Sequence, residues 1–178
     1  MNFKSVSSAF RAAFLVVSAT VMLTSAGGAG AQFFFDNPDW KESEAPPPPA
    51  FDVGKLLTFE VAANPAMLYG VDPATISISK SDSLVRYVIV ASSASGSRNV
   101  MYEALHCASG EVKTYARYTV AGKWQPVTNP QWRSVFEKSP SRHSLAFAKL
   151  GACDARAPAT SVGEIVGKLK NSPRYLDQ

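Results

Sequence analysis

The stretch Ser77-Ile78-Ser79-Lys80 matches S-x-x-K, the nucleophile signature of penicillin-binding enzymes. That chemistry requires the serine and the lysine to lie one helical turn apart, and no K-T-G segment accompanies them. Here both residues fall in an alternating run of apolar and polar residues, TISISK, which is typical of a β-strand. Residues three apart in a strand face opposite sides of the sheet, so the spacing argues against this nucleophile.

A serine hydrolase would instead need a histidine base, and the chain offers His106 and His143. No G-x-S-x-G motif is present, and both histidines lie in ordinary strand or helix sequence. We interpret His143 as a residue on the surface of a helix. Paired carboxylates of the glycosidase kind stay open as an alternative. The acidic residues that could form such a pair are scattered: Glu60, Asp72, Asp82, Glu103, Glu111 and Glu137. We predict no catalytic residue and no cofactor.

Residues 1–31 have the three parts of a secretory signal peptide. Lys4 and Arg11 give a basic start, Ala12–Leu23 is apolar, and Ala29-Gly30-Ala31 is a cleavage site that leaves Gln32 as the mature start. The apolar part is shorter than the ~20 residues that span a bilayer, which argues against an uncleaved anchor. The sequence therefore predicts export to the periplasm, with no transmembrane segment in the mature chain.

Charge gives little reason to expect a nucleic-acid partner. The chain carries 18 basic and 14 acidic residues, and removal of Lys4 and Arg11 with the leader leaves a net charge of +2. Nucleic-acid binding usually requires a much larger excess of basic residues.

The two cysteines, Cys107 and Cys153, both follow the leader, and export would place them where disulfides persist. Their pairing would close a span of 46 residues, which the chain-entropy model values at about 4 kcal/mol. A metal site is the alternative, with His106, His143 and Asp154 as further ligands. Neighbouring strand residues such as His106 and Cys107 face opposite sides, so we favour the disulfide and predict no metal.

An aromatic arm follows the leader, and it could bind a partner. Residues 32–44 (QFFFDNPDWKESE) precede the proline run of residues 45–50, which we interpret as an extended polyproline spacer. Exposed aromatic side chains require cover from the domain or from another protein. The candidate interaction surface consists of Phe33, Phe34, Phe35, Trp40, Trp124 and Trp132.

Other aromatic and basic residues are distributed along the predicted strands. The tyrosines at 87, 102, 115 and 118 could line a carbohydrate or peptide groove with Trp124 and Trp132. Cross-strand pairs in a sheet core explain them more simply. A second hypothesis is a basic patch on one sheet face, although a solvated face is the default. Its members would be Arg86, Arg98, Lys113, Arg117 and Arg133.

The elements that would position these residues are centred on residues 84–120. Three alternating runs, 84–90, 98–107 and 112–120, are separated by small-residue turns at 91–96 and at Ser109-Gly110. Turns this short join only antiparallel neighbours, so the pattern predicts a β-meander. Arg86 is the only charged residue of the first run, which indicates that most of both faces of that strand are covered.

Shorter elements flank the meander. We expect strands at 56–62, 67–71 and 75–80, and a last edge strand at 132–136. A short helix over 139–150 should end at Gly151, and a second amphipathic helix is possible at 161–171. The predicted fold is α+β and mainly antiparallel β, a meander sheet with one or two C-terminal helices and one disulfide. The predicted domain spans 51–155, and 156–178 form a loosely attached, partly helical tail.

Several motifs occur together in one order: DNPDWKESE before a proline run, VRYVIVASSASGSRNVMYEALHC, EVKTYARY and W-x-P-x-x-NPQWR. In this respect the chain resembles the cryptic neisserial protein-like family of exported proteobacterial proteins, over residues 33–153. The resemblance implies a periplasmic domain without an assigned activity, and it supplies no catalytic or ligand-binding residue. The segment after Arg156 looks like an addition beyond the family's usual end.

The sequence therefore supports three hypotheses. The first is a non-catalytic envelope module that binds another envelope protein or a cell-wall component through its aromatic arm and one sheet face. The second is a small periplasmic hydrolase with a groove beside Trp124 and Trp132. The third is a small-ligand carrier with a cavity inside the sheet.

Overall fold

Three long antiparallel strands form the centre of the sheet: β4 (Leu84–Ser93), β5 (Arg98–His106) and β6 (Glu111–Tyr118). Each is joined to the next by a tight hairpin, which confirms the predicted meander. The first eight residues of β4 are all buried, Arg86 included, so both faces of this strand are covered as expected. The computed structural model describes residues 39–61, 64–137 and 142–171. The predicted leader and Phe33–Phe35 lie outside these residues.

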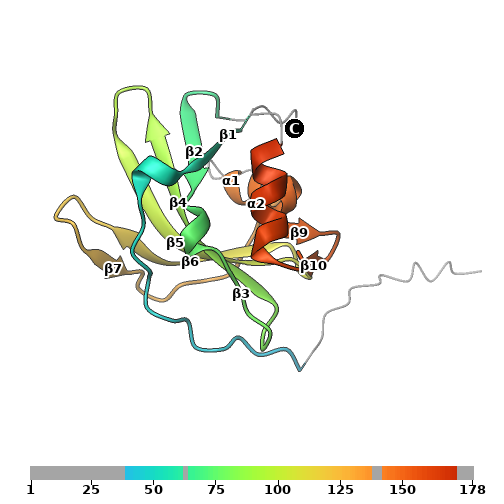
Figure 1. Ribbon diagram of the computed structural model, residues 1–178. Coiled ribbons are helices and arrows are strands. Elements are labelled where there is room, and N and C mark those ends of the chain that lie inside the picture. Colours follow the sequence, from blue (N-terminus) through green and yellow to red (C-terminus); the bar gives the residue numbers. More distant parts are fainter. Residues whose placement is uncertain (1–38, 62–63, 138–141, 172–178) are drawn as a thin grey trace, which may run out of the picture. The chain divides into compact units, whose positions relative to one another are not determined.

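The other strands extend the sheet on both sides in the order β1-β2-β4-β5-β6-β7, with β3 paired to β4 and β8 paired to β6 (Figure 1). Their bounds are β1 Leu57–Glu60, β2 Met67–Val71, β3 Ser77–Ile78, β7 Trp124–Pro126 and β8 Arg133–Ser134. β7 lies between the predicted meander and the predicted edge strand over 132–136.

The expected strand over 75–80 is mostly wrong. Asp72 caps a 3₁₀ turn at Pro73–Thr75 by accepting a hydrogen bond from the Ala74 amide, because proline at the first position favours a helical start. Only Ser77 and Ile78 remain in a strand. Thr75 is buried, and its hydroxyl accepts a hydrogen bond from the Val88 amide, which ties the turn to β4.

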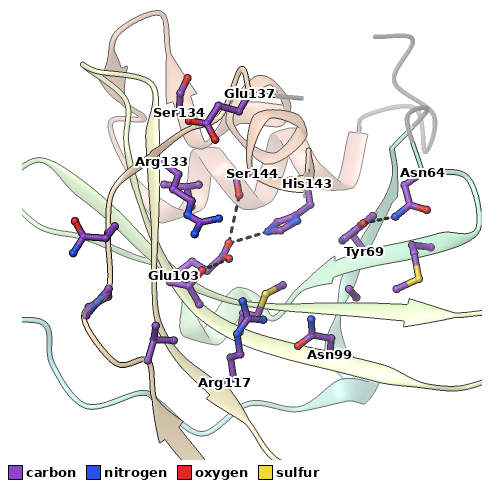
Figure 2. Close-up of a pocket in the computed structure, with 18 of the residues that line it drawn as sticks. Asn64, Tyr69, Asn99, Glu103, Arg117, Arg133, Ser134, Glu137, His143 and Ser144 are labelled. Carbon is purple, nitrogen blue, oxygen red and sulfur yellow. Dashed lines mark hydrogen bonds and ion pairs between the residues drawn. The ribbon is translucent and has the colours of Figure 1, made fainter. Parts of the chain in front are cut away.

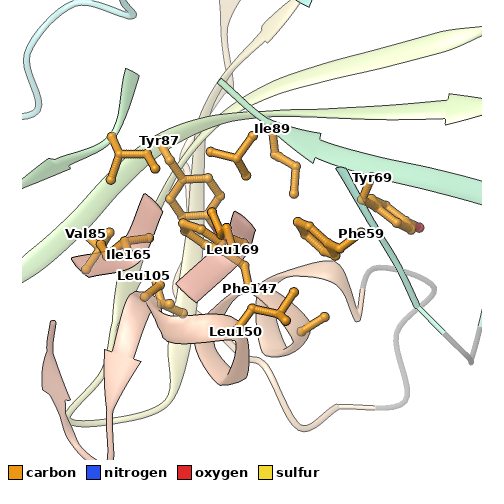
Figure 3. Close-up of a cluster of buried hydrophobic side chains, with 14 of the residues drawn as sticks. Phe59, Tyr69, Val85, Tyr87, Ile89, Leu105, Phe147, Leu150, Ile165 and Leu169 are labelled. Carbon is orange, nitrogen blue, oxygen red and sulfur yellow. The ribbon is translucent and has the colours of Figure 1, made fainter. Parts of the chain in front are cut away.

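Helices cover the first face of the sheet (Figures 1 and 3). They are α1 (His143–Phe147), a π turn at Ala148–Ala152 and α2 (Val162–Asn171), with the short hairpin β9 (Cys153–Asp154) and β10 (Ala157–Pro158) between them. The core on this face joins helix and sheet side chains that include Phe147, Ile165, Leu169, Phe59, Val85, Tyr87, Ile89 and Leu105.

The segment 157–171 therefore packs on the core and is not a loosely attached tail. Ile165 is fully buried and Leu169 is 8% exposed. Gly163 and Gly167 lower the intrinsic helix propensity of α2, but the apolar face that the helix packs against the core offsets this cost.

The predicted helix over 139–150 begins at His143, and residues 139–141 lie outside the described residues. The α-helix ends earlier than expected, at Phe147; a π turn follows to Ala152, and its helical backbone is interrupted at Gly151. This glycine has φ of 124°, and a Cβ there would lie 2.6 Å from the Lys168 side chain of α2. A larger residue would be strained and would displace α2. The turn delivers Cys153 to Cys107, and the predicted disulfide is confirmed with a Cα–Cα distance of 5.7 Å.

The second face of the sheet is covered by the chain's own residues 39–56, which we call the covering segment (Figure 1). Its Phe51 packs edge-on against Tyr118 and Trp124. Phe51 and Leu56 also pack against a second core cluster, formed by Val88, Val90, Val100, Tyr102 and Ala116. The proline run is thus no free spacer, because Ser43 before it and Asp52 after it are both hydrogen-bonded to the domain. No helix in the described ranges is both long and apolar enough to span a membrane.

Candidate functional site

A cleft of about 570 Å³ opens on the first face of the sheet, next to the start of α1 (Figure 2). Strands β2, β4, β5 and β6 form its floor, residues 127–137 form one wall, and His143 and Ser144 of α1 form another. The apolar part of the lining includes Met67, Tyr69, Ala91, Met101, Val112 and Val127.

Glu103 of β5 lies at the floor of this cleft, where its side chain is only 3% exposed. One carboxylate oxygen, Oε1, accepts a hydrogen bond from Thr114 Oγ1 at 3.0 Å. The other, Oε2, lies 3.1 Å from the Tyr87 hydroxyl, 3.0 Å from Nε2 of His143 and 3.4 Å from the Ser144 hydroxyl. Strands β4 and β6 and helix α1 thus each supply at least one partner to a carboxylate of β5.

These contacts decide the protonation of the site. Burial alone would raise the pKa of Glu103, but the charge interaction and hydrogen bond with His143 and the hydroxyl donors hold it below its ordinary value. The pKa of Tyr87 is raised well above its ordinary value by burial and by the negative charge of Glu103. Glu103 is therefore ionised at neutral pH and Tyr87 is a neutral donor.

His143 is 1% exposed, so its assignment to a helix surface is wrong. An ionised carboxylate can only accept hydrogen bonds, so Nε2 of His143 carries the hydrogen that is donated to Glu103. Its other ring nitrogen, Nδ1, is buried and has no hydrogen-bond partner within the described part of the chain. The ring of Tyr69 stacks against the imidazole at 5.2 Å between centroids.

Glu103, His143 and Ser144 do not form a catalytic triad. In a triad the histidine accepts the proton of the serine hydroxyl and binds the carboxylate through its other nitrogen. Here the Ser144 hydroxyl donates to the carboxylate itself, and Ser144 is fully buried. The arrangement can hold a charge in a fixed place, but it provides no activated nucleophile.

Two arginines also line the cleft, Arg117 of β6 and Arg133 of β8, the short strand paired to β6. Both are exposed, and neither has an ion-pair partner among the described residues. The predicted basic patch does not form. Arg86 is buried with Asp82, and Lys113 pairs with Glu42 of the covering segment, so neither contributes to the cleft.

Three tryptophans of the predicted interaction surface lie on the second face and contact their own domain. Trp40 stacks on His106 at 4.3 Å between ring centroids and lies 5.9 Å from Trp132. Trp124 packs against Phe51. The covering segment thus occupies the place beside Trp124 and Trp132 where a hydrolase groove was hypothesised. Contact of these residues with a partner stays a prediction.

Charged and polar groups hold the covering segment. Glu42 accepts hydrogen bonds from Lys113 Nζ at 2.6 Å, Tyr115 at 2.7 Å and Trp132 Nε1 at 3.1 Å. Burial alone would raise the pKa of Glu42, but Lys113 and the other donors lower it. At the next residue, the backbone amide of Ser43 donates to Asp82 at 3.0 Å.

Asp82 and Arg86 form the second part of this attachment. Arg86 lies 2.7 Å from Asp82 Oδ2, with side chains 4% and 0% exposed. Burial alone would raise the pKa of Asp82, but hydrogen bonds from Arg86 and Ser43 lower it. Ser43 of the covering segment is therefore tied to a buried ion pair.

The two histidines lie on opposite faces, which rules out the metal site considered with Cys107, since both cysteines are in the disulfide. In the ranges that the structure describes, no group of three or more histidine, cysteine, aspartate or glutamate side chains could hold a metal ion.

Sequence reasoning did not assign Glu103 and His143 to a site, although one signal was present. Glu103 alternates with Met101 and Leu105 on the strand face that becomes the core. A single carboxylate between two core positions requires a buried partner, because an unpaired buried charge costs several kcal/mol. Nothing in the spacing identified His143, 40 residues further on, as that partner.

Residues 35–170 match the model of a protein family described as the CNP1-like family. The matched region includes α2, so the C-terminal helix is part of the family's domain and is not an addition after Arg156. No curated protein and no solved structure matches the chain.

Proposed function

Because the chain belongs to the CNP1-like family, to which no activity is assigned, we propose its function from the cleft: it is an exported, non-catalytic module that binds a small ligand there. The binding site would then lie on the first face of the sheet and not on the aromatic arm. The observation that carries it is a cleft with a fixed buried charge at its floor and, on its lining, two arginines that form no ion pair with any described residue.

Size and lining support binding of a small molecule. Small-molecule sites are mostly clefts of ~300–1,000 Å³ that combine apolar surface with a few fixed polar groups. The cleft falls in this range and combines Met67, Tyr69 and Met101 with Arg117 and Arg133. The covering segment, by contrast, already uses Trp40 and Glu42 to contact its own domain.

The hydrogen bonds of Glu103 support a non-catalytic role. A general base needs a free lone pair that can reach a substrate proton. The carboxylate of Glu103 already receives four hydrogen bonds, and its pKa is lowered, which makes it a weak base. The Ser144 hydroxyl donates one of those hydrogen bonds to the carboxylate, so it is not hydrogen-bonded to a histidine that could activate it as a nucleophile.

Export to the periplasm is supported by the basic, apolar and small-residue parts of residues 1–31. The disulfide between Cys107 and Cys153 agrees with an oxidising compartment, because such bonds rarely persist in the cytosol. Cell fractionation followed by mass spectrometry should find a mature chain that starts at Gln32 and retains the disulfide. A chain that keeps residues 1–31 in the cytosolic fraction would contradict this part of the proposal.

The binding role can be tested with a variant that fills the cleft. Thr128 is exposed and lines the cleft, so Thr128→Trp should block it with little cost to the core, whereas Lys123→Trp on the β6–β7 turn should not. Small molecules from an envelope extract should shift the backbone NMR signals of cleft residues in the native chain and in Lys123→Trp, but not in Thr128→Trp.

Turnover tests the competing hydrolase function in the same samples. Bound compounds should be recovered unchanged, and a p-nitrophenyl ester should not be cleaved above background. Ester or amide cleavage that disappears in Ser144→Ala would replace the binding proposal with a hydrolase. Shifts confined to the covering segment would return attention to the second face.

A further inference from the structure

We infer that the cleft takes a ligand with an anionic head, a carboxylate or a phosphate group, joined to a short apolar body. The inference rests on the proposed binding function and names the class of ligand. The cationic groups that would bind the head are the guanidinium groups of Arg117 and Arg133.

The two arginines reach the cleft from different places along the sheet. Arg133 of β8 is paired with Val112 of β6, and Arg117 lies five residues further along β6. At ~3.3 Å per residue, their backbones are about 16 Å apart along the strand. Figure 2 shows their side chains pointing from these two ends toward the region of Glu103. A ligand between them would have a cation at each side.

The lining favours an anion over a cation. A bound cation would need free carboxylate oxygens, and those of Glu103 are already used by Tyr87, Thr114, Ser144 and His143. Glu137 is the other carboxylate on the lining, and it lies on the exposed wall segment. The guanidinium groups, in contrast, present donors in the planar geometry that matches carboxylate and phosphate oxygens.

A further polar group has an unused hydrogen-bonding capacity. The lining residue His143 is 1% exposed, yet its Nδ1 atom has no partner in the described part of the chain. Buried polar atoms in folded proteins are nearly always hydrogen-bonded, so this atom can exchange a hydrogen bond with a polar group that enters the cleft. Figure 2 shows His143 beside Glu103 at the same end of the cleft as Tyr69.

The apolar body follows from the other lining residues. Met67, Tyr69, Met101 and Val112 offer a surface on which a chain of a few carbons loses contact with water. Methionine side chains adapt to differently shaped apolar groups, which suits a ligand of varied body. A head group alone would leave this surface unused.

Matched six-carbon probes separate the contributions of charge and of apolar contact. Hexanoate, hexyl phosphate, hexanamide and hexylamine share the body and differ in the head. Each is titrated into the ¹⁵N-labelled mature chain, and dissociation constants are obtained from shifts of backbone signals on β5, β6 and residues 127–134. We expect hexanoate or hexyl phosphate to bind at least about tenfold more tightly than hexanamide, and hexylamine to bind least. Whichever of hexanoate and hexyl phosphate binds more tightly shows whether the natural ligand carries a carboxylate or a phosphate ester.

Variants then assign the charge effect to the two arginines. Arg117→Gln and Arg133→Gln should each weaken the binding of the anionic probes by about tenfold and leave the affinity for hexanamide unchanged. Arg98→Gln is the matched control, because Arg98 is an exposed arginine of β5 that does not line the cleft. Higher salt should weaken the binding of the anionic probes but not that of hexanamide.

The outcomes separate this inference from the function on which it rests. If hexanamide shifts the cleft signals as strongly as hexanoate, or if the arginine variants bind the acids unchanged, the anionic class is wrong and a binding cleft remains. If none of the four probes shifts a cleft signal at its highest soluble concentration, both the inference and the binding function are overturned.

Discussion

Mutations at Glu103 and His143 should be strongly non-additive in their effect on the free energy of unfolding. The reason is that each side chain offsets most of the free-energy cost of burying the other. The test is a double-mutant cycle of Glu103→Gln, His143→Gln and the double variant. Gln keeps the shape of Glu103 but removes its charge. Gln at 143 removes the imidazole and leaves the charged carboxylate with only its three hydroxyl donors.

The magnitude follows from the geometry. For a fully charged pair at the observed 3.0 Å, Coulomb's law with an effective dielectric constant of ~20 gives ~5 kcal/mol, an upper limit that desolvation reduces. A hydrogen bond to a charged group contributes ~1.5–3 kcal/mol. We therefore expect His143→Gln to lower the free energy of unfolding by about 3 kcal/mol, because it leaves a buried charge. Glu103→Gln should cost about 2 kcal/mol.

The assay is urea denaturation followed by circular dichroism, with equal m values as a check that all variants unfold alike. The double variant should lose at least about 1 kcal/mol less than the sum of the two single losses. Glu111→Gln, a half-exposed neighbour on β6, is the control and should change stability by less than about 0.5 kcal/mol.

The pH dependence of this coupling has a definite sign. The pKa of Glu103 is lowered in the folded state, so its contribution to the free energy of unfolding is complete above the ordinary glutamate value of about 4.5 and is lost as pH falls through the lowered value.

Additive losses of the two single variants at pH 7, within about 0.5 kcal/mol, would refute the argument that these side chains stabilise each other.

Three further predictions concern the disulfide and the covering segment. Replacing Cys107 and Cys153 together with alanine should lower the free energy of unfolding by about 4 kcal/mol, because the bond closes a span of 46 residues; an unchanged urea midpoint would count against this. Trp40→Ala should cost about 2 kcal/mol through lost stacking on His106, and Lys41→Ala, an exposed neighbour, should cost less than about 0.5 kcal/mol in the same urea titration. The pKa of Glu42 is lowered in the folded state, so its stabilisation of the covering segment is complete above the ordinary value of about 4.5 and is lost as pH falls through the lowered value. Tryptophan fluorescence should therefore change on acidification, less so in Glu42→Gln, and identical profiles would contradict this attachment.

The central meander could be predicted because its signals are local. Alternation over residues 84–120 and the small-residue turns between the runs determine strand order and direction without information from the rest of the chain. The disulfide was predictable for a similar reason, since two cysteines allow one pairing. Gly151 could be recognised as the point where the helical backbone is interrupted, because few other residues adopt its φ of 124°.

The covering segment and the cleft depend on contacts between distant residues, which local patterns do not encode. Trp40 finds His106, and Glu42 finds Lys113, only after the sheet has formed. The aromatic arm therefore looked like a surface for a partner, although residues 39–56 complete the domain's own second core cluster. His143 was misjudged for the same reason: its flanking serines indicate a polar surface, and its buried partner lies 40 residues earlier.

The most direct test of the account is whether the native protein carries a ligand in the cleft. Native mass spectrometry of protein isolated gently from the cells that produce it should show a bound small molecule in the natural chain and in Lys123→Trp, and none in Thr128→Trp. Equal occupancy in Thr128→Trp, or no bound mass in any of the three, would contradict the assignment of the cleft as the binding site.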